Sequence, residues 1–277
     1  MNSVQKSSKF LQRSTGKGFL SYKYLGGKTK LKDLFQQGNL KIRFPLSYNS
    51  FSEAVIINTA GGFTGGDSFK FKMEVGNRCK LLLSGQAAEK VYKCIDGYVK
   101  IRNKISLKNQ SKLIWLPQEL IMFNEARIKR QTSVNLSKSS IFLGVESVVF
   151  GRDKMGEKIH KGLFDERWKI YLDGELIYSD FSFIEGDINQ KIKKSAILDK
   201  SNSMSSIIFY KHNMGDLIDY INNRIVDLPS EIGVSKISKN LMVFRLVSKN
   251  SRTLKEAISK IVCLIIPDLK LPKTWSI

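Results

Sequence analysis

The stretch Ser68-Phe-Lys-Phe-Lys-Met-Glu-Val75 alternates apolar and polar side chains at every second position. Because successive side chains of a strand point to opposite faces, this pattern predicts a half-buried strand. The same alternation returns at 99–107 and, more weakly, at 128–136. One apolar face and one solvated face are typical of antiparallel sheets, so we expect these three strands to lie in antiparallel pairs.

Other segments extend the β prediction over the first two thirds of the chain. Residues 141–150 are apolar almost throughout, which predicts a strand buried on both faces. Further strands are expected at 54–57 and 80–83. Asp173-Gly174 separates two short strand patterns and predicts a two-residue hairpin turn, because both central positions of such a turn need positive φ.

The last third changes to a helical period. Apolar residues at 217, 218 and 221 predict a short helix, and 241–247 predict one more strand. Thr253-Leu-Lys-Glu256 has the form of a capping box and predicts the start of an amphipathic helix that Pro267 ends. No Pro/Gly/Ser-rich linker divides the chain. We therefore expect one β-rich domain over 18–277 with a few, mostly C-terminal helices, preceded by a flexible basic arm over 1–17.

Composition limits the class of protein. The chain has 277 residues and a formal net charge of +21. A basic surface favours nucleic acid as a partner, but 35 of the 46 cations are Lys, whereas Arg is preferred for bidentate phosphate and base contacts. The positive charge is also dispersed, and residues 140–190 are net acidic. A basic β-rich nucleic-acid-binding module therefore remains the alternative hypothesis, not the first one.

The cellular setting follows from what the sequence lacks. Its longest apolar run, 261–266, is far shorter than the roughly 20 residues of a membrane span. The N-terminus has no apolar segment of the kind found in secretory signals. Three widely spaced cysteines, Cys79, Cys94 and Cys263, argue against a disulfide framework. We expect reduced thiols and a cytoplasmic protein.

The densest special sequence is the glycine-rich run at 58–68, which contains Thr59, Gly61, Gly62, Gly65, Gly66 and Asp67. Its spacing is close to that of a phosphate-binding P-loop, but Asp67 stands where the P-loop needs Lys, and a strand is expected to follow instead of a helix. A nucleotide is therefore not expected here. Asp67 either accepts hydrogen bonds from loop N–H groups or presents a carboxylate at a crevice.

Three further blocks carry polar residues in unusual settings. Ser84, Gln86, Lys90 and Tyr92 either form contacts or belong to a solvated strand and turn. Glu119 and Glu146 lie among apolar residues and should be paired, because an unpaired buried carboxylate is costly. For Glu146 the alternatives are a buried ion pair with Arg or Lys and a polar lining of an internal passage.

Catalytic and strong metal sites have little support. The two histidines, His160 and His212, are far apart in sequence, and no nucleophile motif accompanies them. His160 is expected at the surface. No cluster of His, Cys, Asp and Glu has ligand spacing, so any metal handling would use oxygen ligands and be weak. We expect no enzyme activity and no catalytic residue.

Taken together, these blocks resemble the urease accessory protein D family, UreD, also called UreH. The family's Thr-Ala-Gly-Gly-x-x-Gly-Gly-Asp run is similar to 59–67, its Gln-Ala-Ala-x-Lys-x-Tyr run to 86–92, and its Trp-Leu-Pro-Gln-Glu run to 115–119. A Gly-Arg…Met-Gly-Glu segment matches Gly151, Arg152, Met155, Gly156 and Glu157. Near the end, Gly233-Val-Ser235, Arg245 and Pro272-Lys-Thr-Trp275 follow in order. Gly85 and Lys273 depart from the pattern, where the family has a hydroxyl residue and Arg.

The resemblance implies a non-catalytic chaperone with a β-helix-like stack of sheets. Such a protein binds apo-urease and the accessory proteins F and G, with GTP bound by G and not by this chain. It passes Ni²⁺ transiently, through an internal passage, to the dinuclear nickel site of urease, and holds no tightly bound cofactor. Neither nucleic acid nor a membrane is implied as a partner. The expected contact or relay residues are Thr59, Gly61, Gly62, Gly65, Gly66, Asp67, Ser84, Gln86, Lys90, Tyr92, Gln118, Glu119, Glu146 and Arg152. The expected ligands for weak, transient binding of Ni²⁺ are Asp67, Glu119 and Glu146.

Overall fold

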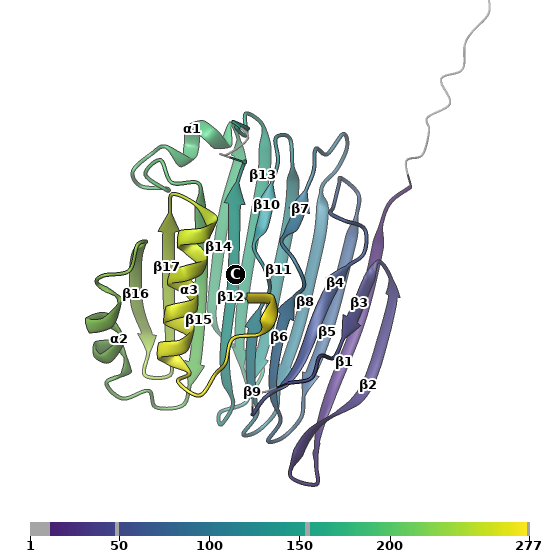
Figure 1. The fold of residues 1–277 in the computed structure, drawn as a ribbon, viewed down its shortest axis with the longest axis vertical. Coiled ribbons are helices and arrows are strands. Elements are labelled where there is room, and N and C mark those ends of the chain that lie inside the picture. Colours follow the sequence, from purple (N-terminus) through teal and green to yellow (C-terminus); the bar gives the residue numbers. More distant parts are fainter. Residues whose placement is uncertain (1–11, 48–49, 153–155, 276–277) are drawn as a thin grey trace, which may run out of the picture.

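The protein is described by a computed structural model that covers residues 12–47, 50–152 and 156–275. It is mainly β, with 53% of residues in strands and 12% in helices, and two stacked sheets dominate Figure 1. The seven-stranded sheet has the order β14(Glu175–Gly186), β13(Gly162–Leu172), β11(Arg127–Leu136), β8(Val99–Leu107), β5(Ser68–Val75), β1(Thr15–Leu25), β2(Lys28–Gly38).

The second sheet has ten strands in the described part of the chain. Its main path has the order β16(Glu231–Ser238), β17(Leu241–Ser248), β15(Ser203–Lys211), β12(Ile141–Phe150), β9(Lys112–Leu116), β6(Lys80–Gly85), β4(Ser52–Asn58), β3(Leu40–Arg43). Two short strands, β10(Leu120–Met122) and β7(Glu89–Val91), pair beside β12.

The chain alternates between the two sheets from β4 to β13, as in a solenoid. Strands that are neighbours within one sheet are therefore one coil apart and run in the same direction. This corrects the antiparallel prediction for 68–75, 99–107 and 128–136, because β5, β8 and β11 pair parallel. A period-2 pattern reports which face is buried, and strand direction depends on the path between strands. Antiparallel pairs occur at the ends of the sheets, as in β1–β2 and β13–β14.

Several local predictions are confirmed. Asp173 and Gly174 have φ of 49° and 93° in the turn between β13 and β14, as a two-residue hairpin requires. Strand β12 is buried on both faces: Phe142 contributes to the core between the sheets, and Val145 to the core beneath the helices. The three cysteines are free thiols.

The helices of the described residues lie in the last third of the chain. They are α1(Ile188–Ile192), α2(Leu217–Ile225), α3(Ser251–Ile265) and the 3-10 turn η2(Lys273–Trp275). Figure 1 shows α3 against the outer face of the ten-stranded sheet. The predicted capping box is wrong in detail. Asn250, in an extended conformation, caps α3 by accepting a hydrogen bond from the Thr253 N–H at 2.9 Å, and Glu256 pairs with Arg252 instead. None of the helices in the described ranges is long and apolar enough to cross a bilayer.

The expected basic arm over 1–17 is only partly described. Residues 1–11 lie outside the described residues. Thr15 to Lys17 belong to β1, which corrects the boundary of the arm. They are held in the sheet because β1 pairs parallel with β5, with Lys17 opposite Lys70.

Candidate functional site

A buried group of charged side chains lies between the two sheets, at the centre of the molecule. Arg130 on β11 projects inward, as does Glu146 on β12, and their side chains are only 7% and 2% exposed. The Arg130 Nη1 atom lies 2.7 Å from Glu146 Oε2. Arg130 also forms an ion pair with Glu166 on β13, with Nε 2.5 Å from Oε1. The Arg130 guanidinium therefore forms ion pairs with two buried carboxylates.

The remaining Glu146 oxygen is held by neutral donors. The Trp115 Nε1–H donates to Glu146 Oε1 at 3.1 Å, and the Thr132 hydroxyl lies 3.4 Å from the same atom. Burial raises the pKa of Glu146 to about 7, an effect that the charge of Arg130 opposes. This carboxyl therefore exchanges its proton near neutral pH. The ion pair predicted for Glu146 is confirmed.

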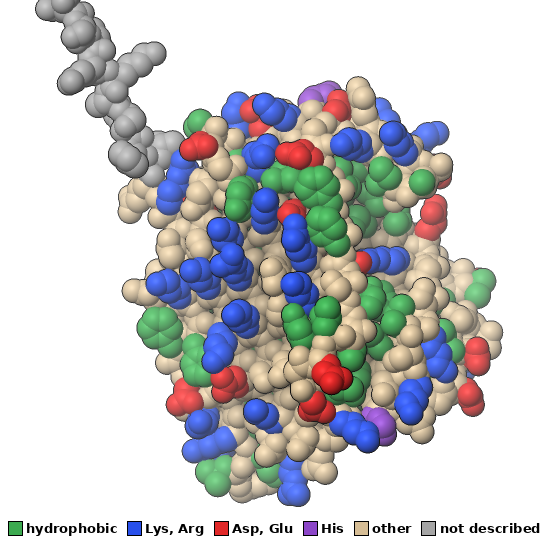
Figure 2. Space-filling view, turned by 180° about the vertical axis from the view of Figure 1, so that it is seen from behind, with side chains coloured by type: hydrophobic (Ala, Val, Ile, Leu, Met, Phe, Trp, Pro, Cys, Tyr) green, Lys and Arg blue, Asp and Glu red, His purple; other side chains and the backbone are tan. Residues whose placement is uncertain are grey.

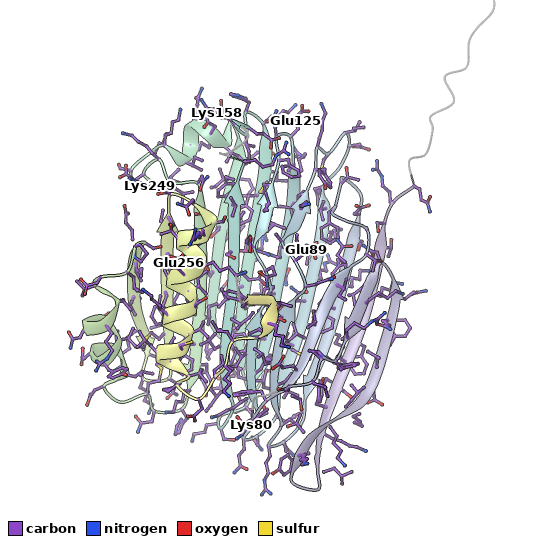
Figure 3. All side chains as sticks on the ribbon, viewed as in Figure 1. Lys80, Glu89, Glu125, Lys158, Lys249 and Glu256 are labelled. Atoms are coloured by element: carbon purple, nitrogen blue, oxygen red, sulfur yellow. The ribbon has the colours of Figure 1, made fainter. Side chains whose placement is uncertain are left out.

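A cavity of about 70 Å³ adjoins this group, which is room for several water molecules. Its polar lining is formed by Ser84, Glu89, Asn103, Gln118, Arg130 and Glu146. Glu89 comes from β7 and lies near the middle of the view in Figure 3. Burial raises the pKa of Glu89, against a 3.0 Å hydrogen bond from the Asn58 amide and the charge of Arg130. Glu146 thus also lines this cavity, whereas an internal passage, the second alternative that the sequence left open, stays a prediction.

The C-terminal 3-10 turn binds two residues of the cavity wall. The Gln118 Nε2 atom donates to the Thr274 carbonyl at 2.6 Å, and the Thr274 hydroxyl donates to Ser84 Oγ at 3.0 Å. Trp275 is buried, and its Nε1–H donates to the Leu116 carbonyl at 2.9 Å. Figure 1 shows this turn against the middle of the ten-stranded sheet. The Trp-Leu-Pro-Gln-Glu block and the C-terminal block, far apart in sequence, therefore meet here.

Glu119 is half-buried and lies outside the carboxylate group around Arg130. Its charge acts on Lys255 of α3, where it opposes the lowering of the Lys255 pKa by burial. Lys255 Nζ donates to Gln118 Oε1 at 2.9 Å and lies 5.2 Å from the centre of the Trp275 ring. Glu119 therefore belongs with the contacts around the C-terminal turn.

The glycine-rich loop forms a second site, at the surface. Asp67 is buried, with Oδ1 accepting from the Ser14 N–H at 2.7 Å and Oδ2 from the Thr64 N–H at 2.8 Å. Oδ2 thus closes the loop, which is the structural alternative for this residue, and Oδ1 joins the loop to the residue that precedes β1. A β-carbon at Gly65 would lie 1.9 Å from the Asp96 carbonyl, so only glycine permits this close approach. The strand β5 follows directly, as expected for a loop that is not a P-loop.

The glycine-rich loop pairs with the block that follows β6. The Phe63 N–H donates to the Lys90 carbonyl at 2.7 Å, and the Tyr92 N–H donates to the Phe63 carbonyl at 2.8 Å. The Tyr92 ring is half-exposed and rests beside Gly62 and 4.9 Å from Phe123, between ring centres.

The other expected contact residues of these two blocks, and Arg152, are exposed at the surface. The Arg152 guanidinium lies 4.6 Å from the centre of the Phe123 ring and forms a 2.7 Å ion pair with Glu157. Thr59, Gly61, Gly66, Gln86 and Lys90 are exposed, whereas Met155 lies outside the described residues. His160 is exposed, as predicted.

The structure does not bring the three tentative Ni²⁺ ligands together. Glu146 lines the cavity, Glu119 lies near α3, and Asp67 closes the surface loop. Among the described residues, no group of three His, Cys, Asp or Glu side chains is arranged to hold a metal ion.

Sequence reasoning missed Glu89, Asn103, Arg130 and Glu166. A signal existed for three of them. Each of these three occupies an inward position of an alternating strand. Asn103 and Glu166 have apolar residues two positions away on both sides, and Arg130 has one on its N-terminal side. Glu89 has no such signal, because β7 is only three residues long.

The raised pKa of Glu146 makes the stability of the protein depend on pH. Because the folded-state pKa, about 7, exceeds the ordinary value of 4.5, the folded state holds this proton more tightly than the unfolded state. This contribution is complete below about pH 4.5 and is lost as pH rises to 7. We expect Glu146→Gln to reduce the fall in unfolding free energy between pH 5 and pH 8, by at most about 3 kcal/mol.

Urea denaturation of both proteins across this pH range measures the effect. Glu74→Gln is the matched control, because Glu74 pairs with Lys72 on the outer face of β5 and is 42% exposed. Parallel pH profiles for the wild type and Glu146→Gln would contradict a Glu146 pKa near neutrality.

Comparison with known proteins gives a consistent result over nearly the whole chain. The family model described as UreD urease accessory protein matches residues 14–276. The chain is 32% identical over 266 residues to the urease accessory protein UreD of Agrobacterium fabrum, covering 96% of this chain and 92% of that protein. It is 33% identical over 268 residues to the protein of the same name from Rhizobium etli, covering 96% of each. With urease accessory protein UreD 1 of Brucella abortus it shares 31% identity over 272 residues, which cover 96% of this chain and 95% of that protein.

Proposed function

Because the chain belongs to the UreD urease accessory protein family, we propose that it is a urease maturation chaperone that binds apo-urease and accessory proteins F and G and passes Ni²⁺ toward the dinuclear site of urease. It acts in the cytoplasm, without catalytic activity of its own. GTP is bound by G. Ni²⁺ is cargo, held only in passing.

The observation that carries the nickel part of this proposal is the cavity between the sheets, whose mainly apolar wall holds a few polar and charged side chains. Its carboxylates, Glu89 and Glu146, supply oxygen atoms, which bind Ni²⁺ less tightly than thiolate or imidazole groups. Weak ligands suit a protein that must release the ion. Cys79 and Cys94 are buried elsewhere, and neither lines the cavity.

Charge supports the same proposal. Arg130 supplies one positive charge to the buried carboxylates of Glu146 and Glu166, with which it forms ion pairs, and to the half-buried Glu89. Glu146 can hold a proton near neutral pH, because burial raises its pKa to about 7. A cation that enters the cavity would favour release of this proton, since opposite charge nearby stabilises the ionised form. The buried group can thus adjust its charge to an empty or an occupied cavity.

The role in maturation is tested by deleting the gene for this chain from cells that express its urease. We expect urease to be produced but inactive and nickel-poor, with nickel measured by mass spectrometry of the purified enzyme. Urease with its normal nickel content would contradict the proposal.

The nickel path is tested by Glu89→Gln and Glu146→Gln in the same cells. Both variants are expected to lower urease activation more than they lower co-purification with F. Glu74→Gln is the matched control, because Glu74 lies on the outer face of β5. Full activation by both cavity variants would contradict the path while leaving the maturation role intact.

A further inference from the structure

The outer face of the seven-stranded sheet carries rows of cations that have no part in the nickel path proposed above. Figure 2 shows this side of the molecule, with Lys and Arg side chains over the left half and the middle. We call this surface the basic face, and it consists of outward-pointing residues of five adjacent strands: Lys17, Lys70, Lys72, Lys100, Arg102, Lys104, Lys129, Arg167 and Lys169.

The cations of the basic face lie directly opposite one another in the sheet register. Lys17 is opposite Lys70, and Lys70 is opposite Arg102. One row further along, Lys72 is opposite Lys104. Neighbouring strands are only about 4.8 Å apart, so these like charges repel. Like charges directly opposite one another destabilise a sheet.

Few carboxylates offset this repulsion. Glu74 pairs with Lys72 at 2.9 Å, and Asp165 with Arg167 at 2.8 Å. In the described ranges the other cations of the basic face form no ion pair: these are Lys17, Lys70, Lys100, Arg102, Lys104, Lys129 and Lys169. The isolated chain thus bears a repulsion that a negatively charged partner would remove.

Two phenylalanines extend the same face at its β14 edge. Phe181 is opposite Arg167 and Phe183 is opposite Asp165, so both side chains point outward with the cations. They are 55% and 49% exposed, and their ring centres lie 5.8 Å apart. An exposed aromatic pair beside Arg is typical of the centre of a protein–protein interface.

These features favour a protein over a nucleic acid as the occupant. Seven of the nine cations are Lys, and one of the two Arg, Arg167, is already occupied by Asp165. The Arg167 guanidinium also lies 4.5 Å from the centre of the Phe181 ring, where a base would otherwise stack.

We propose that the basic face, together with Phe181 and Phe183, is a docking surface for a protein that presents a row of carboxylates beside an apolar patch. This proposal depends on the proposed function in one respect: the partner is taken to be a protein of the urease assembly. The binding chemistry itself does not depend on nickel delivery.

The charge part is tested with purified full-length protein and labelled polyglutamate as the probe, by fluorescence anisotropy at increasing salt. We expect the triple variant Lys70→Glu, Arg102→Glu, Lys104→Glu to lose about tenfold or more in affinity at low salt. The matched control is Lys236→Glu, Lys239→Glu, Lys249→Glu, which makes the same charge change on exposed residues in or beside β16 and β17 of the other sheet. Its affinity should stay within about twofold of the wild type.

Two outcomes would overturn the charge part. Equal losses in the two triple variants, or none in either, would mean that net charge and not the basic face binds the probe. Single-stranded RNA that binds more tightly than polyglutamate of equal charge, and loses affinity only in the basic-face variant, would assign the surface to nucleic acid.

The apolar part has its own test. An acidic peptide with two leucines should bind more tightly than the same peptide with serines in their place, and Phe181→Ser with Phe183→Ser should abolish this difference. A difference that persists in the variant would overturn the role of the two phenylalanines. Because these assays contain no urease, their results do not depend on whether the maturation role holds.

Discussion

Replacing Arg130 by methionine is expected to lower the unfolding free energy by about 3–5 kcal/mol at pH 8. Arg130 is the cation that faces Glu146 and Glu166, and its charge also acts on Glu89. Its removal leaves three carboxylates between the sheets without a counter-charge. Equilibrium denaturation in urea measures the loss, and a variant that fails to fold at pH 8 agrees with the expectation.

The pH dependence identifies the cause of this loss. Without Arg130, protonation of the buried carboxylates should relieve their repulsion, so the deficit of the variant should shrink from pH 8 to pH 5. A loss of packing alone would not change in this way. A deficit that is the same at both pH values would contradict the electrostatic explanation.

Two variants control for the change of side chain. Arg102→Met makes the same replacement on the solvated face of β8 and should alter stability by less than about 0.5 kcal/mol. Arg130→Met combined with Glu146→Gln and Glu166→Gln should recover part of the loss, because the uncompensated charges are then gone.

Replacing Trp275 by alanine is expected to have the second large effect, a loss of about 3–5 kcal/mol in the stability of the docked C-terminal turn. Trp275 is 5% exposed and packs in the apolar cluster beneath α3, and its N–H is satisfied by the Leu116 carbonyl. Removing the indole leaves a void and an unpaired carbonyl. Hydrogen exchange of the amides in β6 and β9 measures how often this part of the sheet opens.

The position of the turn gives this variant a further consequence. Thr274 is bound to Ser84 and Gln118, and both line the cavity. Without the turn, Ser84 and Gln118 lose their hydrogen bonds to Thr274. Amide exchange should therefore become faster in β6 and β9, and not in β13 and β14.

Trp275→Phe is the matched control for packing. It keeps a ring in the apolar cluster but loses the N–H donor, and it should cost about 1 kcal/mol. If Trp275→Ala exchanged no faster than Trp275→Phe, the ring would contribute nothing to the docking of the turn.

Local sequence patterns predicted several strands and one hairpin turn of the fold. The alternation at 68–75 and 99–107 identified strands β5 and β8 and their buried faces, because strand periodicity is a local property. Asp173-Gly174 identified a hairpin turn for the same reason, since its φ angles depend on the two residues themselves. Strand direction was wrong, because it depends on connections that cross from one sheet to the other.

The candidate site was readable only in part. Glu146 stood out, because a carboxylate in an apolar strand needs a partner. The sequence could not supply that partner: Arg130 lies on another strand of the other sheet, and only the stacking of the sheets brings the two together. The same holds for Ser84 and Thr274, which are 190 residues apart in the chain and 3.0 Å apart in space.

The sequence by itself identified several strands, among them β5, β8 and β12, together with the buried faces of those that alternate, but it did not identify β1, β2, β15 or β16. It also showed that a few carboxylates stand among apolar residues. It also held the ordered motifs that resemble the UreD family. The tertiary structure alone decided that Asp67 closes a loop, that Glu146 lines a cavity beside Arg130, and that dispersed lysines form rows on one face. The physical reason is that alternation and turn preference act between residues close in sequence. Ion pairs, cavities and charged surfaces instead depend on distances between residues that only the packing of two sheets makes short.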